Sequence, residues 1–208
     1  MPDRPVLVAY ASRHHGTEGI ARVVATTLRA GGFRVDFRRA QNVARVGRYV
    51  AVVVGSAVYM AQWEEAALAL LRRERAALAR RPVWLFSSGP VGDGKTTRRP
   101  ETVPHPEIVA GLADEIGVRG SAMFGGRVDT DEAGFDMEVM AAAGLQGDWR
   151  DLSRVRAWSH AVAVAIRAEV DCQAAALADA AREAAMTTEA ADAPEAAREA
   201  VAATDSLV

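Results

Sequence analysis

Residues 6–28 read VLVAYASRHHGTEGIARVVATTL, and this stretch joins a short apolar run to a helical pattern through a polar loop. The run VLVAY at residues 6–10 is rich in valine and ends in tyrosine, a composition typical of a β-strand. From Thr17 onward, residues that can face a core recur at helical spacing, at positions 20, 23, 24, 27 and 28. The stretch therefore predicts a strand followed by an amphipathic helix, which Gly31 and Gly32 end.

The same alternation of strand and helix continues to about residue 170. We predict further strands at residues 33–37, 49–54, 83–86 and 118–124, and further helices at residues 63–80, 106–116 and 151–170. Runs that are apolar throughout, such as YVAVVV and VWLF, indicate strands buried on both faces of a sheet. The sequence therefore predicts an α/β fold, a doubly wound parallel sheet of five strands with helices on both faces.

The composition of the 208 residues, 50% hydrophobic and 25% charged, is that of a globular protein. The single cysteine, Cys172, excludes an intrachain disulfide and a cysteine-built metal site. No apolar run approaches the ~20 residues of a membrane span, and the N-terminus lacks the layout of a signal peptide. We expect a soluble cytoplasmic protein that binds no nucleic acid, with peripheral membrane contact left open.

The formal net charge of −2 is unevenly distributed along the chain. From Asp171 onward there are eight acidic residues against two arginines, so this segment carries −6 and the remainder +4. The segment is also rich in alanine, and Pro194 interrupts it. We therefore expect two parts: a domain at residues 1–170, and an acidic, alanine-rich tail at residues 171–208 that is mobile or partly helical.

Ligands of doubly wound sheets bind at the carboxyl ends of the strands, so the loops there are the first places to look for a site. The loop after the first strand combines hydroxyl groups, cationic side chains and a glycine at a helix N-terminus, which suits a phosphate. The alternative is an ordinary strand-to-helix turn with Thr17 as N-cap. The candidate phosphate-binding residues are Ser12, Arg13, His14, His15, Gly16 and Thr17.

Two further loops contribute candidates at the same edge. After the third strand, small residues are followed by large apolar ones, which would let a flat ring approach the backbone and then cover it. The alternative is that these large side chains only pack the loop onto the domain. The candidates are Ser56, Ala57, Val58, Tyr59 and Met60 in this loop, and Ser88, Gly89, Pro90, Val91 and Gly92 after the fourth strand.

Residues 89–96, GPVGDGKT, match the phosphate-loop pattern G-x-x-x-x-G-K-[ST] of nucleotide-binding proteins. That pattern requires a helix to begin at the lysine, but Pro100, Pro104 and Pro106 follow closely and would break it. The pattern also follows the fourth strand rather than the first. We therefore reject the interpretation that the chain is a nucleoside triphosphatase.

His105 and His160 are single histidines far apart in the sequence, so we predict no metal site. No residue is identified as catalytic.

Several of these segments resemble the flavodoxin family. SRHHGTE at residues 12–18 resembles its phosphate loop, although His15 stands where the common pattern has glycine. GSAVYMAQW (55–63), FSSGPVG (86–92), FGGRVD (124–129) and GDWRDLSRVRAW (147–158) resemble the branch that includes the menaquinone-dependent protoporphyrinogen oxidases. The similarity runs from residue 6 to residue 170, and leaves the tail outside.

This resemblance implies strand order 2-1-3-4-5 and non-covalently bound FMN. The phosphate would lie at residues 12–17, and the isoalloxazine between residues 56–60 and 88–92. The implied function is an oxidoreductase that passes electrons from a porphyrinogen-like substrate to a quinone. Two alternatives stay open: a flavodoxin-type electron carrier with a redox-protein partner, and a degenerate flavodoxin fold that serves as a non-catalytic binding module.

Overall fold

The structure is a computed structural model that describes residues 4–89, 105–128, 142 and 146–191. Contacts between residues divide the chain into two units, Met1–Arg167 and Ala168–Val208. The elements in order are β1 (Val6–Ala11), α1 (Gly16–Ala30), β2 (Val35–Arg39), the 3-10 turn η1 (Ala40–Asn42), β3 (Ala51–Tyr59), β4 (Gln62–Trp63), α2 (Glu65–Arg73), α3 (Arg75–Leu78), β5 (Val83–Gly89), α4 (Glu107–Ile116), β6 (Gly120–Gly125), β7 (Arg127–Val128), β8 (Gly147–Asp148) and α6 (Leu152–Ala191).

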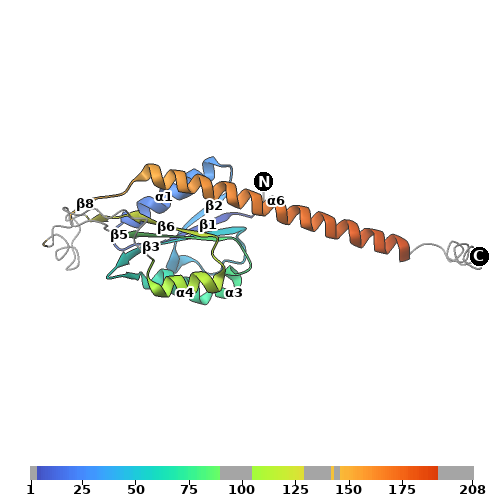
Figure 1. The fold of residues 1–208 in the computed structure, drawn as a ribbon, viewed down its shortest axis with the longest axis horizontal. Helices are drawn as coiled ribbons and strands as arrows, with labels where there is room; N and C mark the ends of the chain where they lie inside the picture. The colour runs from blue at the N-terminus through green and yellow to red at the C-terminus, as the bar shows by residue number, and fades with distance from the viewer. Residues whose placement is uncertain (1–3, 90–104, 129–141, 143–145, 192–208) are drawn as a thin grey trace, which may run out of the picture. The chain divides into compact units, whose positions relative to one another are not determined.

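Five strands form a parallel sheet in the order β2-β1-β3-β5-β6, which confirms the predicted doubly wound fold. Val6 of β1 lies between Val35 of β2 and Ala51 of β3, so the central strands start at one level. The short strand β4 pairs antiparallel with β3 and lies off this path. Figure 1 shows α1 and the first turns of α6 on one face of the sheet, and α3 and α4 on the other.

The sheet separates two packed layers. On the side of α2 and α4, Leu7, Val54 and Leu85 belong to one buried cluster with Leu70 and Leu71. On the opposite side, the ring of Phe86 lies 6.1 Å from those of Phe124 and Trp158, centroid to centroid. Alternation of side chains along each strand supplies both layers from the same strands, as expected where a sheet is buried on both faces.

Gly55 of β3 pairs with Phe86 of β5, and the Phe86 ring covers the backbone of Gly55. A Cβ atom at Gly55 would lie 1.9 Å from Cζ of that ring, so no side chain fits there. Glycine at this position is therefore what brings Phe86 close enough to the sheet to reach Phe124 and Trp158.

Several element boundaries differ from those predicted. β3 runs on to Tyr59 through the segment predicted as a loop, because Ser56 and Ala57 keep their pairing with β5 and Val58 pairs with β4. The helix predicted at residues 63–80 is two helices, α2 and α3, with a break at Glu74. The last helix does not end at Val170 but continues to Ala191, as the high helix propensity of its many alanines favours.

Three arginines hold the segment between η1 and β3 through its backbone carbonyl groups. Arg4 donates to the carbonyl of Arg48, at 3.2 Å, and Arg73 donates to that of Val43, at 2.6 Å. Arg81 donates to the carbonyl of Val46. Arginines from three separate parts of the chain thus fix the approach to β3.

The contact between Gly55 and Phe86 predicts that Gly55→Ala destabilises the fold. The added methyl group must displace the ring, which costs about 1–3 kcal/mol of unfolding free energy. Gly111→Ala on α4 is the matched control, because a Cβ there meets nothing within 4 Å. Alanine favours a helix over glycine by about 0.8–1.0 kcal/mol, so the control should stabilise. Urea unfolding measures both, and equal effects of the two variants would contradict the assigned contact.

Candidate functional site

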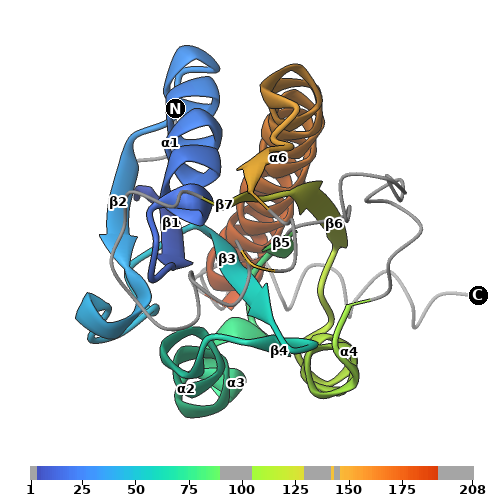
Figure 2. The ribbon, with the colours of Figure 1, turned by 90° about the vertical axis from the view of Figure 1, so that its left-hand side faces the viewer.

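A cleft opens at the carboxyl edge of the sheet, where four parts of the chain meet. Figure 2 looks onto this edge, with β7 beside α1 and β4 on the side of α2. The cleft is lined by the start of α1, the end of β3, the end of β5 and the strand β7. The lining residues are Ser12, Gly16, Thr17, Ala57, Val58, Tyr59, Ser88, Gly89, Gly126, Arg127 and Val128.

The first loop ends in a left-handed residue, His15, with φ 52° and ψ −7°. α1 begins at the next residue, Gly16, so Thr17 lies inside the helix and the alternative in which Thr17 is the N-cap is wrong. Nδ1 of His15 lies 3.0 Å from Oε2 of Glu18, and this contact ties the loop to the first turn of the helix. The amide of Gly16 donates to the carbonyl of His14 and that of Gly19 to the carbonyl of His15, so Thr17 and Glu18 carry the first-turn amides that have no partner within the helix. The helix N-terminus has a partial positive charge.

Thr17 and Ser88 connect the start of α1 to the end of β5. Their hydroxyl oxygens lie 2.7 Å apart, and both residues are buried. Both residues also line the cleft, so this hydrogen-bonded pair forms part of its wall. The structure thus brings together one candidate from the predicted phosphate loop and one from the predicted ring-binding loop.

The neighbouring serines point to the opposite side of the sheet. Ser56 Oγ accepts a hydrogen bond from the amide of Glu64, at 2.9 Å, and so does not line the cleft. Trp63 Nε1 donates to Ser87 Oγ at 2.7 Å, and Ser87 Oγ lies 2.8 Å from Nδ1 of His105. Ser87 Oγ therefore accepts from Trp63, and it either donates to or accepts from Nδ1 of His105 according to the tautomer of the imidazole. Burial lowers the pKa of His105, in keeping with a neutral ring.

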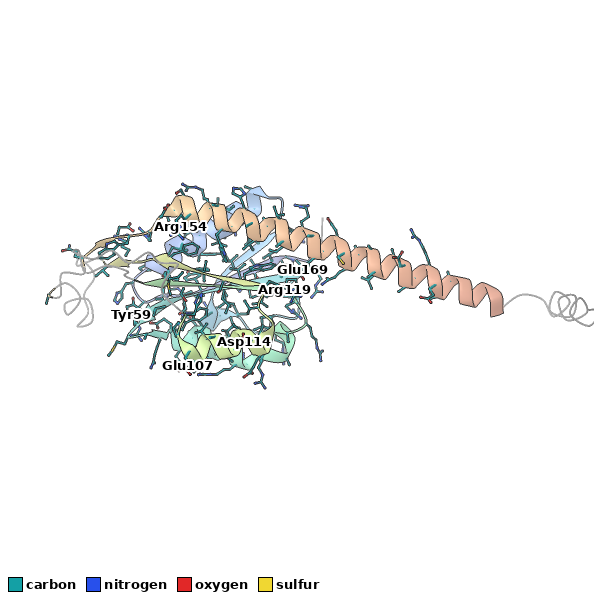
Figure 3. All side chains as sticks on the ribbon, viewed as in Figure 1. Tyr59, Glu107, Asp114, Arg119, Arg154 and Glu169 are labelled. Atoms are coloured by element: carbon teal, nitrogen blue, oxygen red, sulfur yellow. The ribbon has the colours of Figure 1, made fainter. Side chains whose placement is uncertain are left out.

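The third candidate segment forms a tight hairpin. Met60 and Ala61 both have positive φ, 47° and 59°, and they form the turn between β3 and β4. Met60 is 97% exposed at this turn and does not line the cleft. Tyr59 does line it, and Figure 3 shows Tyr59 at this edge, with Arg119 at the opposite end of the sheet.

Cationic and aromatic side chains surround the Tyr59 ring. Cζ of Arg13 lies 5.5 Å from its centroid, and the His14 ring lies 6.2 Å away, edge to face. Arg13 also pairs with Glu64, with Nε 2.9 Å from Oε1. Arg13, His14 and His15 therefore lie next to the cleft without lining it. Pro90, Val91 and Gly92 fall outside the described residues.

Sequence reasoning missed three lining residues, Gly126, Arg127 and Val128. In the sequence, FGGRVD is notable for following a predicted strand. Its two adjacent glycines are the feature that could have indicated a close backbone contact there. The amide of Gly126 donates to the carbonyl of Gly89 at 2.6 Å, and a Cβ at Gly126 would lie 2.8 Å from the Gly89 carbonyl carbon. This close approach turns the chain across the edge of the sheet toward α1.

The strands β7 and β8 pair antiparallel and pack against the N-terminal half of α1. A Cβ at Gly16 would lie 3.4 Å from the carbonyl oxygen of Arg127, so β7 passes directly over the start of the helix. Arg150 lies against Gly19 further along α1, where a Cβ would be 2.5 Å from Nη1. Arg150 also donates to Asp148 at 2.7 Å, and this hydrogen bond holds the pKa of Asp148 below its usual range.

The described part of the chain contains no group of three or more His, Cys, Asp or Glu side chains placed to hold a metal ion. Nor is any of its helices both long enough and apolar enough to cross a membrane. Cys172 is exposed and forms no disulfide.

The fold and the cleft define a flavodoxin-like protein, with a doubly wound sheet and a ligand edge at the start of α1. The flavodoxin domain family matches residues 7–141, and the chain belongs to this family. No curated protein matches the sequence.

Several solved structures superpose on the chain at low sequence identity. Rubredoxin oxygen:oxidoreductase from the anaerobe Desulfovibrio gigas superposes with a TM-score of 0.52 at 16% identity. The match covers 81% of this chain but 37% of that one, so this chain spans well under half of that protein's length. A flavodoxin from the domain Archaea has a TM-score of 0.47 at 13% identity, over 68% of this chain and 94% of its own. A flavodoxin from Streptococcus pneumonia has a TM-score of 0.48 at 14% identity, over 74% of this chain and 94% of its own.

The cleft residues fit FMN, the cofactor expected in this family. Ser12, Gly16 and Thr17 line the cleft at the start of α1, and hydroxyl residues at a helix N-terminus suit a phosphate. Ala57, Ser88 and Gly89 have small side chains or none, so a ligand can approach the backbone at the strand ends. A Cβ at Gly89 would be 3.4 Å from the carbonyl oxygen of Val58. Small residues beside an aromatic ring, Tyr59, suit a flat heterocycle.

The chain of hydrogen bonds through Ser87 predicts a pH-dependent stability that originates at His105. The folded-state pKa of His105 lies below its ordinary value of 6.5, so the unfolded chain takes up a proton at a higher pH than the folded chain does. The full contribution to stability is present above pH 6.5 and is lost as the pH falls from there through the folded-state pKa.

Unfolding by urea at a series of pH values checks this. His105→Asn, which keeps an acceptor for Ser87 but does not titrate, should lose part of the pH dependence between about pH 7 and pH 5. His160→Asn, at an exposed position of α6, is the control and should keep it. A His105 variant with the same slope as the wild type would contradict the assignment.

Proposed function

We propose that this protein binds FMN in the cleft at the carboxyl edge and acts as a flavin-dependent oxidoreductase in the cytoplasm. The observation that carries the proposal is the meeting of the α1 N-terminus with the ends of β3 and β5 and with β7 in one cleft. The helix start and Ser12 and Thr17 would hold the phosphate. Tyr59, Ala57 and Gly89 would border the isoalloxazine.

FMN, when bound, supplies the capacity to accept and release electrons, and the protein supplies position and electrostatics. The Thr17–Ser88 hydrogen bond fixes the strand end of β5 relative to α1, which keeps the phosphate and ring subsites at a constant separation. The network of Trp63, Ser87 and His105 supports the same strand end from the other face of the sheet. The chain's own contribution is therefore a rigid edge with a positive helix end.

The charges at this edge support an enzyme acting on an anionic organic substrate. Arg13, Arg127 and Arg150 lie around the cleft, against Glu64 and Asp148. A carrier that docks onto basic redox proteins would present an acidic face, which these residues do not form. We propose a porphyrinogen-like substrate, whose carboxylates suit the arginines, that loses three hydride equivalents and three protons to become a porphyrin. Each hydride and proton together convert one quinone to its quinol, so three quinones are consumed.

The first test is FMN binding by the purified chain. Titration with FMN should quench flavin fluorescence with a dissociation constant of about 1 μM or tighter, which corresponds to about −8 kcal/mol. The flavin absorbance should persist through desalting. Protein that stays colourless and takes up no added FMN would overturn the proposal and favour the non-catalytic binding module. The left-handed His15, in the place of a glycine, is the observation that favours that alternative.

The second test separates enzyme from carrier. FMN-loaded protein is mixed with protoporphyrinogen and menaquinone under anaerobic conditions, and porphyrin fluorescence is followed over time. We expect quinone-dependent formation of porphyrin. Absence of turnover with any quinone, together with rapid electron exchange with a redox protein such as a ferredoxin reductase, would assign the carrier role instead.

A further inference from the structure

The strand β7 places Arg127 in the wall of the cleft, opposite the start of α1. Among the described residues that line the cleft, Arg127 is the one with a cationic side chain. Its backbone lies against Gly16, where a Cβ would be 3.4 Å from its carbonyl oxygen, 3.5 Å from its nitrogen and 3.6 Å from its Cβ. The root of the Arg127 side chain therefore lies directly beside the predicted phosphate position.

The nearby arginines are held by carboxylates of the same edge. Arg13 pairs with Glu64 at 2.9 Å and contacts the Tyr59 ring. Arg150 donates to Asp148 through Nε and Nη2, its side chain is only 15% exposed, and it lies against Gly19. Neither of them lines the cleft. Arg127 itself pairs with Asp148 in the β7–β8 ladder and its charge acts on that carboxyl, but Arg127 is exposed and, unlike the other two, borders the cleft.

We infer that Arg127 is the residue that makes the cleft select a phosphorylated flavin over the same flavin without its phosphate. This inference rests on the proposed function. A phosphate monoester carries close to two negative charges at neutral pH, and a helix N-terminus offers only about half a positive charge. A guanidinium adds a full charge and can donate two parallel hydrogen bonds to phosphate oxygens. β7 is the element that brings such a group to the helix start.

The glycines of this edge explain how β7 reaches that position. A Cβ at Gly126 would crowd the backbone of Gly89, at 2.8 Å, and a Cβ at Gly16 would be in van der Waals contact with the backbone of Arg127. Close backbone approach on both sides positions Arg127 through main-chain packing rather than through its own side chain. A substitution of the Arg127 side chain should therefore leave the path of β7 unchanged.

The experiment compares FMN with riboflavin, which lacks the phosphate, on wild type, Arg127→Gln and Arg127→Lys. We expect the wild type to bind FMN more tightly than riboflavin. Arg127→Gln should weaken FMN binding by about 10- to 100-fold, the range for one charge-assisted contact, and leave riboflavin binding unchanged. Arg127→Lys should recover part of the loss. Added salt should weaken FMN binding less in Arg127→Gln than in wild type.

Arg29→Gln is the matched control, because it removes the same charge from the opposite end of α1. It should leave the ratio of FMN to riboflavin affinity as in wild type. An Arg127→Gln protein that folds and keeps that ratio overturns the inference, while FMN binding itself stands. An equal loss for both flavins also overturns it, since the role would then be structural. A wild type that binds neither flavin overturns the proposed function and the inference together.

Discussion

The Phe86 ring rests on the backbone of Gly55, and the arrangement of the functional edge depends on this contact. It fixes Phe86 toward the aromatic layer with Phe124 and Trp158. Because side chains alternate along a strand, Ser87 points to the opposite face of the sheet from Phe86, and Ser88 points to the same face as Phe86. Ser87 points toward Trp63, and Ser88 points back toward Thr17. Because Gly55 has no side chain, the Phe86 ring can pack against it, and this packing directs both Ser87 and Ser88 into their hydrogen bonds at the end of β5.

The cleft combines rigid strand ends with a helix start and a wall supplied from later in the chain. The strand ends carry small residues, and hydrogen bonds to buried serines fix them. β7 and β8 then cover the start of α1 and bring arginines to it. A positive helix end, hydroxyl groups and a guanidinium in one place form a consistent environment for an anionic group. This consistency, more than any single residue, supports a flavin phosphate there.

Much of the fold could be predicted from local sequence patterns. Apolar runs of strand length and helical periodicity indicate the five parallel strands and the helices between them, because each pattern reflects burial of a single element. Boundaries that depend on a partner were wrong. β3 extends to Tyr59 because β5 and β4 supply its hydrogen bonds, and no periodicity within β3 itself indicates this. The phosphate-loop pattern at residues 89–96 fails on its prolines, and Gly89 lies at the end of β5 instead.

For the candidate site, the sequence alone determined which loops lie at the carboxyl edge, since topology places all such loops together. It also determined their chemistry, with hydroxyl groups and glycine near a helix start. Only the tertiary structure decided that Ser56 turns away from the cleft while Ser88 faces it, and that β7 returns across α1 with Arg127. The physical reason is that these features arise from contacts between segments distant in the chain, such as Gly126 with Gly89 and Gly16 with Arg127. A single sequence carries no direct sign of such contacts.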